Sequence, residues 1–294
     1  QQIVASRVLA YFSPAAQFNE TGVLSYYQFL GDLEKKLSQS LDEVAAKLAE
    51  TARLVFNREH LLISLTCEEE DYKQFEGHVS AFTDALGTAD LPIKGYVFQT
   101  KQRNEGLMTS GKVQYVAKGA NFRQLGYDYH GSMKVLETIL RYDYLWNRVR
   151  VQGGAYGGFA QFERAGNMVL GSYRDPNLAE TIKVYDETAQ YLSNFAVSQR
   201  EMTKYIIGTM SQLDTPLTPQ MKGERAAMQY IRGISQADIQ RERDEILTTK
   251  QETIQQLAPV VDEAMKQNYL CVLGSEEKIK AHKEVFGQLV TLSE

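Results

Sequence analysis

Two side chains that could bind a peptide flank a glycine-rich stretch, RVQGGAYGGF. The stretch begins at Arg150 and contains Tyr156, and its two glycine pairs are Gly153 with Gly154 and Gly157 with Gly158. Glycine weakens a strand interior, so this run indicates a bulge or a place where another backbone approaches closely. An extended peptide along this strand would need that clearance, and a guanidinium and a phenol could donate to one of its carbonyls. One interpretation of the stretch is therefore a peptide-binding strand with Arg150 and Tyr156 as donors.

A purely structural interpretation of the same stretch is also open. Arg150 would complement the carboxy-terminal dipole of its helix, and Tyr156 would pack in a core. The glycines would then serve a bent hairpin. From spacing alone, this structural interpretation is the stronger of the two.

No pattern in the sequence predicts a metal site. The four histidines are His60, His78, His130 and His282. No two of them lie four apart with Glu between, so each is expected at the surface or in a core. The two cysteines, Cys67 and Cys271, each lie in an apolar, strand-like run and are too few for a disulfide framework. We expect two buried thiols in a reducing compartment.

Composition narrows the classes of partner. The chain has 294 residues, 43% of them hydrophobic and 23% charged, which is enough apolar surface for one or two cores. A net charge of -5 and a pI near 5.6 provide no basic field for nucleic acid or anionic lipid. No apolar run is long enough for a membrane span, and the first residues lack the order of a signal peptide. We expect a soluble chain in the cytoplasm or an organelle matrix.

The first part of the chain predicts a helix, a strand and a second helix. Residues 41–55 form an apolar helical face, and the run from His60 to Glu68 is strand-like. The face consists of Leu41, Val44, Leu48, Ala52 and Val55. Residues 71–86 predict the second helix. The segment that follows is rich in turn residues and contains Pro92, so residues 87–111 are expected to be a linker.

Beyond the linker, residues 112–122 predict a strand, and a helix after Tyr129 is expected to end near Arg150. The apolar face of that helix is Met133, Leu136, Ile139 and Leu140. Two runs around RAGN predict a hairpin. Expected helix starts are Asp175 with Pro176, Ser198 with Glu201, Thr218 with Pro219, and Thr249 with Glu252. Pro259 either kinks its helix or marks a first turn.

An internal repeat would constrain the architecture further. HLLISLTCEE, from His60, resembles NYLCVLGSEE, from Asn268: each is an apolar strand after a helix, followed by two glutamates and another helix. The two segments lie 208 residues apart, so a repeat unit of about that length leaves 86 residues for an earlier, truncated unit. This predicts the end of a truncated domain over 1–86 and, beyond the linker, a complete domain over 112–294. Chance is the alternative, because such endings are common in α+β proteins.

Three segments resemble the pitrilysin/insulinase zinc peptidases, specifically the presequence-protease branch. They are YDYLWNRVRVQGGAYGGFAQF, GSYRDPNLAETIKVYDETAQYL and the late segment DIQRERDEILTTKQETIQQLAPVVDEAMKQNYLCVLGSEEKI. The resemblance runs from about residue 112 to the end. It implies an α+β fold of four related domains, each a mostly antiparallel sheet covered by helices, that close as two halves around a peptide. Residues 1–86 would be the end of the third domain, and residues 112–294 the fourth.

The resemblance also implies a division of labour. Zinc would be held by the amino-terminal half through H-x-x-E-H, which this sequence lacks, so no metal ligand is expected here. Arg150 and Tyr156 would bind the substrate carbonyl and stabilise the charge that develops on it, while Gly153, Gly154 and Gly157 leave room for the peptide. We expect the substrate-binding part of an endopeptidase for short unstructured peptides, inactive alone and able to self-associate. The alternatives are an inactive partner or structural subunit of the same fold, and an independent peptide-binding module.

Overall fold

The structure is a computed structural model that describes residues 1–59, 61–88, 95, 97 and 104–292. The chain divides into two compact units. The first, called here the sheet unit, comprises Gln1–Tyr26, Phe98–Asp214 and Ala237–Glu294. The second, the helical unit, comprises Tyr27–Val97 and Thr215–Gln236. No helix of the described residues is long and apolar enough to cross a bilayer.

The sheet unit is built on six strands in the spatial order β3-β4-β2-β5-β1-β6. They are β1 (Glu105–Thr109), β2 (Gln114–Asn121), β3 (Gly157–Phe162), β4 (Asn167–Asp175), β5 (Tyr269–Ser275) and β6 (Gln288–Thr291). The ladders from β3 through β4 and β2 to β5 are antiparallel, whereas β1 runs parallel to β5 and to β6. This confirms the expected fold class, α+β with a mostly antiparallel sheet.

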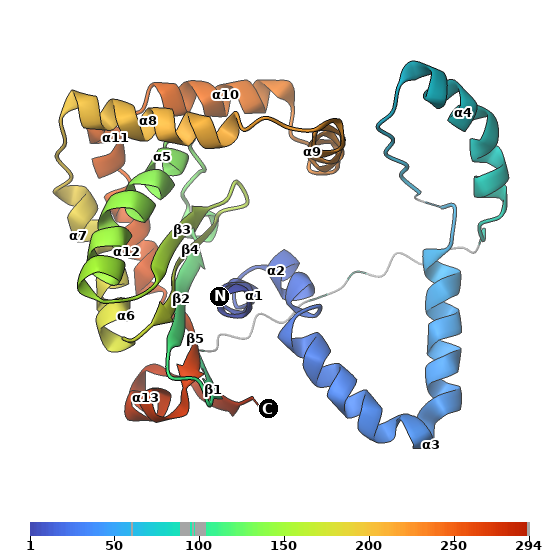
Figure 1. The fold of residues 1–294 in the computed structure, drawn as a ribbon, viewed down its shortest axis with the longest axis horizontal. Coiled ribbons are helices and arrows are strands. Elements are labelled where there is room, and N and C mark those ends of the chain that lie inside the picture. Colours follow the sequence, from blue (N-terminus) through green and yellow to red (C-terminus); the bar gives the residue numbers. More distant parts are fainter. Residues whose placement is uncertain (60, 89–94, 96, 98–103, 293–294) are drawn as a thin grey trace. The chain divides into compact units, whose positions relative to one another are not determined.

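Helices cover one face of this sheet, as Figure 1 shows for α5, α6, α7 and α12. The helices of the sheet unit are α1 (Gln2–Ala10), α2 (Pro14–Glu20), α5 (Ser132–Ile139), α6 (Ala179–Asp186), α7 (Thr188–Ser193), α8 (Gln199–Leu213), α10 (Gln236–Leu247), α11 (Gln251–Gln255), α12 (Ala258–Lys266) and α13 (Glu276–Ala281), with short 3-10 turns η1 (Phe122–Leu125) and η4 (Lys283–Val285). The apolar spacing predicted after Tyr129 forms the buried face of α5. Leu136, Phe162 and Tyr185 are fully buried between helices and sheet. Burying each such side chain stabilises the fold by roughly 1.5–3 kcal/mol.

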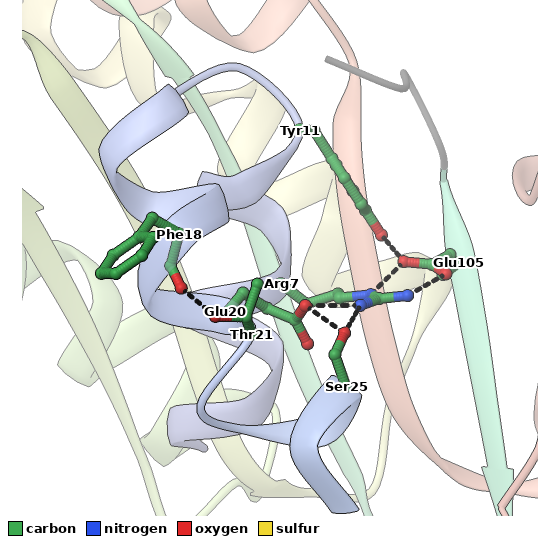
Figure 2. A network of polar contacts seen from close by, with 7 residues as sticks. All are labelled: Arg7, Tyr11, Phe18, Glu20, Thr21, Ser25 and Glu105. Atoms are coloured by element: carbon green, nitrogen blue, oxygen red, sulfur yellow. Dashed lines mark hydrogen bonds and ion pairs between the residues drawn. The ribbon is translucent and has the colours of Figure 1, made fainter. Parts of the chain in front are cut away.

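The first residues of the chain cover the opposite face of the sheet. Val4 and Val8 of α1 pack against β2 and β5 in a second, smaller core. A buried polar network fixes this helix to β1 (Figure 2). Arg7 lies 2.7 Å from a Glu105 oxygen, and the Tyr11 hydroxyl donates to the same carboxylate at 2.7 Å. The other side of the Arg7 guanidinium lies 2.9 Å from Glu20.

The compact units follow different bounds from the division expected at residues 86 and 111. Strand β1 lies within 87–111, the range predicted as a linker, because its parallel ladders to β5 and β6 draw it into the sheet. Residues 1–26 belong to the sheet unit through the contacts of α1. Pro92, the breaker on which the linker prediction relied, lies outside the described residues. The evolutionary domain bounds stay a prediction.

The helical unit contains α3 (Leu24–Val55), which begins in the sheet unit, together with α4 (Glu69–Asp84) and α9 (Pro219–Ile231). Both helices expected in 41–86 are therefore present. The backbone of Ser40 departs from helical angles and kinks α3. The predicted apolar face is solvent-exposed, at 62% for Leu41 and 65% for Leu48. Nothing in the described helical unit buries it.

The strand predicted from His60 differs from what is observed. His60 lies outside the described residues, and residues 61–68 form no regular secondary structure and belong to no ladder in the described part of the chain. The similar segment near Asn268 is instead β5, between β2 and β1. Cys67 is exposed, so the expectation of a buried thiol there is wrong. Cys271, in β5, is buried as predicted.

Two of the four predicted helix starts are confirmed. Ser198 and Glu201 form the reciprocal capping box of α8, and the Thr218 hydroxyl caps α9, which begins at Pro219. Both sites are locally encoded, because the capping side chain reaches its own first turn. Pro259 lies in the first turn of α12, which decides between the two possibilities for it.

The other two starts are wrong. The Thr249 hydroxyl donates to Glu245 of the preceding helix, and α11 begins at Gln251. Asp175 ends β4, and its carboxylate accepts from the Asn177 N–H at 2.9 Å and from the Thr181 hydroxyl at 2.8 Å. Asp175 therefore forms a turn ahead of α6 and is not the N-cap of that helix. An aspartate carboxylate commonly accepts from the backbone N–H two residues on in such a turn.

Candidate functional site

Arg150 lies on an unusual helical segment. After α5 the helix continues as two π-helical segments, η2 (Leu140–Tyr144) and η3 (Trp146–Gln152). Wider turns of this type are rare and are found frequently at functional sites. They place the Arg150 guanidinium 4.2 Å from the centre of the Trp146 ring, which is 42% exposed. The stacked indole orients a cation that stays accessible to solvent.

A tight turn then returns the chain to the sheet and positions Tyr156. The N–H of Gly154 donates to the Arg150 carbonyl at 2.9 Å, and that of Ala155 donates to the Val149 carbonyl at 3.1 Å. Tyr156 follows, immediately before β3, with 58% of its surface exposed. The Arg150 guanidinium lies 5.5 Å from the centre of its ring. The structure thus brings the two predicted donors together at the surface.

The site contains two residues that the sequence analysis missed as functional candidates. Arg174, near the end of β4, places its guanidinium 5.7 Å from the Tyr156 ring. The Tyr173 ring centre also lies 5.7 Å from that of Tyr156. Arg174 has a left-handed backbone, with φ of 48°, which non-glycine residues adopt at a cost of about 1–3 kcal/mol and which clusters at binding sites. The only sequence signal was the segment SYRDPNL, which does not reveal this conformation.

The three candidate glycines each have a local structural reason. A Cβ on Gly153 would lie 2.6 Å from the Val149 carbonyl, and Gly154 has a left-handed φ of 77°. A Cβ on Gly157 would lie 2.5 Å from the Tyr173 hydroxyl, because that ring crosses over the glycine. The turn and the ring already explain these glycines, so room for a bound peptide at them stays a prediction.

Hydrogen bonds from Asn177 and the buried Asp175 hold the turn in place. The Asn177 side chain donates to the Gly153 carbonyl at 2.6 Å, while its own N–H donates to Asp175. Burial raises the pKa of Asp175, although its hydrogen bonds act in the opposite direction. This chain of contacts connects the end of β4 to the glycine turn, and thereby fixes the position of Tyr156.

The electrostatic character of the site is cationic. No carboxylate of the described residues forms an ion pair with Arg150 or Arg174, whereas Arg148 nearby pairs with Glu187 at 2.7 Å. The two guanidiniums offer positively charged hydrogen-bond donors, and the phenol offers a neutral hydroxyl that can donate beside them. Such a set binds carbonyl or carboxylate oxygens and stabilises negative charge as it develops.

The described chain does not fit a zinc ion. Across residues 1–59, 61–88 and 104–292, no three His, Cys, Asp or Glu side chains gather to form a metal site. His78 and His282 each place Nδ1 within hydrogen-bond distance of a backbone carbonyl, as a helical surface histidine would. His130 instead lies 2.8 Å from the Ser132 hydroxyl.

Comparison with known proteins gives relatives over most of this chain. Residues 104–276 match the family model described as the PreP C-terminal domain. The chain is 41% identical to Protein HypA of Clostridium perfringens, over 98% of this chain and 30% of that protein. It is 34% identical to Presequence protease 1, chloroplastic/mitochondrial, of Arabidopsis thaliana, over 95% of this chain and 26% of the relative. The chain thus spans less than a third of either relative.

Solved structures support the fold. The crystal structure of pitrilysin matches with a TM-score of 0.51 and 14% identity, over 76% of this chain and 25% of that one. A protease from Helicobacter pylori matches with the same TM-score and 13% identity, over 70% of this chain and 52% of its own. At such identities the likeness concerns the fold alone.

Proposed function

The chain belongs to the presequence-protease carboxy-terminal domains of the pitrilysin family, and from this we propose that it is the substrate-binding part of a zinc-dependent endopeptidase. In this proposal the zinc is held by an amino-terminal half of the longer protein. In the same proposal this chain contributes binding and electrophilic assistance, and no cluster of three or more potential metal ligands lies among its described residues.

One observation carries the proposal: Tyr156 is exposed between two guanidiniums, those of Arg150 and Arg174, that have no carboxylate partner in the described chain. Unpaired cations beside an accessible phenol are suited to an oxygen-rich ligand such as a peptide backbone. We assign Arg150 and Tyr156 to the carbonyl of the cleaved bond. Donors there stabilise the oxyanion that forms when water adds, and losing one costs roughly 10²- to 10³-fold in turnover.

The proposal is tested with a quenched-fluorescence peptide assay on this chain with zinc, alone and then mixed with a separately expressed amino-terminal half. Activity only in the mixture, abolished by a chelator, is expected. No cleavage in a mixture whose parts are folded and associated would favour an inactive subunit of the same fold instead.

The roles of the site residues are tested by Tyr156→Phe, which removes the donor and keeps the ring. Turnover is expected to fall by about 10² or more. Tyr142→Phe is a matched control, because Tyr142 is 55% exposed and lies 5.5 Å from the Arg141 guanidinium outside the site. An equal loss in both variants, or in neither, would refute the assignment of Tyr156.

The remaining proposals concern the partners and the compartment. We propose unstructured peptides as substrates, the amino-terminal half of the same protein as partner, and self-association of the isolated chain through exposed apolar side chains such as those at Leu41 and Leu48. The cytoplasm and an organelle matrix are both compatible with the relatives, which include mitochondrial and chloroplastic proteins and a bacterial one.

A further inference from the structure

Strand β3 is a terminal strand of the sheet, so only one of its edges is paired. Its ladder to β4 runs from Gly157 opposite Tyr173 to Phe162 opposite Met168. Along its other edge no strand of the described chain follows. Backbone donors and acceptors on such an edge are available to another extended chain.

The polar contacts of Phe162 show which residues of β3 point outward. Its N–H donates to the Glu137 carboxylate of α5, and its carbonyl accepts from the Lys134 ammonium at 2.8 Å. In an antiparallel ladder the outward-pointing groups recur at every second residue. The backbone groups of Ala160 and Gly158 therefore point outward as well. No side chain or loop of the described residues bonds to them.

The two ends of this edge differ in charge. At the Phe162 end, Lys134 and Glu137 pair with each other at 2.9 Å and occupy the backbone. At the opposite end lie the unpaired guanidiniums of Arg150 and Arg174, both beside Tyr156. The open edge is thus capped at one end and cationic at the other.

We propose that an extended, acidic peptide segment binds along the outer edge of β3 as an additional strand. Its backbone pairs with Gly158 and Ala160, the Lys134–Glu137 pair stops it at Phe162, and its carboxylate lies against Arg174. The distance from Gly158 to Phe162 is about 13 Å at the usual rise of a strand, so the paired segment is short. This inference rests on the proposed function, because it specifies how the same site holds a peptide.

A protective role is the competing explanation for the cap, because charged side chains at sheet edges prevent unwanted strand pairing. That role predicts that the whole edge is blocked. In the structure the pair occupies the backbone of Phe162 alone, which leaves two outward positions open.

The first test is amide exchange, followed by NMR on the 294-residue chain with and without an acetylated, amidated peptide of alternating valine and threonine carrying one glutamate. The Gly158 and Ala160 amides are expected to exchange at least about tenfold more slowly with peptide bound. Phe159 and Gln161, which face β4, and Phe162, which is already bonded, serve as internal controls. Binding without protection of Gly158 and Ala160 would overturn the proposal.

The second test varies the peptide, so that folding of the protein is unaffected. N-methylation of the alternate residues that face β3 is expected to weaken binding about tenfold, since each of two lost hydrogen bonds contributes a factor of about three. N-methylation of the other set is expected to be tolerated. Equal effects of both sets would exclude strand addition.

The charge preference is tested by replacing the peptide glutamate with glutamine and by Arg174→Gln, with Arg141→Gln as the control. Either change at the proposed contact is expected to weaken binding about three- to tenfold, and the two together no further. An additive loss, or an equal loss with Arg141→Gln, would refute the role of Arg174. These readouts do not use turnover. If the peptide adds to β3 as expected but Tyr156→Phe does not change turnover, the catalytic role proposed for Tyr156 is refuted and strand addition is not.

Discussion

The buried network between Arg7 and Glu105 allows a quantitative prediction. In the variant Arg7→Met, the Glu105 carboxylate, whose side chain is 1% exposed, keeps the Tyr11 hydroxyl but loses its counter-charge. The Glu20 carboxylate, 7% exposed, loses the same partner. Leaving one partner of a buried ion pair uncompensated costs about 3–5 kcal/mol. Because the Arg7 side chain is 19% exposed, the lower end of that range is expected, about 3 kcal/mol.

Urea unfolding followed by tryptophan fluorescence measures this loss. The chain has a single tryptophan, Trp146, which lies in the sheet unit, so the signal reports on that unit. A loss of 3 kcal/mol lowers the midpoint by roughly 1–3 M urea at the usual dependence on denaturant. Lys47→Met is the control, because its pair with Glu43 is exposed at 71% and 66% and such a surface pair contributes little to stability.

A triple variant separates charge from packing. Arg7→Met with Glu105→Gln and Glu20→Gln removes all three charges of the network and keeps an acceptor for the Tyr11 hydroxyl, so it is expected to recover most of the loss. A triple variant as unstable as Arg7→Met alone would refute the argument from uncompensated buried carboxylates. A single variant that behaves like Lys47→Met would show that α1 is not held to β1 by this pair.

Three further predictions follow from burial and geometry. Burial raises the pKa of Glu137 above its ordinary value of 4.5, so between 4.5 and the raised pKa the folded state holds a proton that the unfolded state has lost. The stability that this group contributes therefore falls as pH rises from about 4.5 through the raised pKa. Glu137→Gln should remove that part of the pH dependence of the urea midpoint. Gly157→Ala should lower the free energy of unfolding or of peptide binding by about 1–3 kcal/mol, because its Cβ would displace the Tyr173 ring. Urea unfolding and peptide titration measure the two free energies. An unchanged variant would show that the ring moves freely. Cys67 should react with a thiol reagent in the folded chain, whereas Cys271 should react only after unfolding. Cys271 is buried, and burial raises its pKa. Mass spectrometry measures both reactions, and equal reactivity would contradict the fold around β5.

Local sequence signals predicted the elements whose determinants lie within a few residues. The spacing of Met133, Leu136 and Ile139 identified α5, and Ser198 with Glu201 identified the start of α8. Signals that needed a tertiary partner failed. Thr249 had the right residue type for a cap, but its hydroxyl bonds to the helix before it. The short apolar run after His60 predicted a strand, yet a ladder requires a neighbouring strand that the described residues do not provide.

For the candidate site, the sequence by itself showed that Arg150 and Tyr156 flank a glycine pair and lie six residues of chain apart. The strand predicted through this stretch is wrong up to Gln152, because Arg150 lies in η3 and a turn precedes β3. The sequence also determined that no zinc motif is present. Only the tertiary structure decided that Arg174 joins them, that Gly157 accommodates Tyr173, and that β3 is an edge strand. Those features depend on which strands pair and in which register. Pairing between distant segments is chosen by the burial of the whole core, which no local pattern specifies.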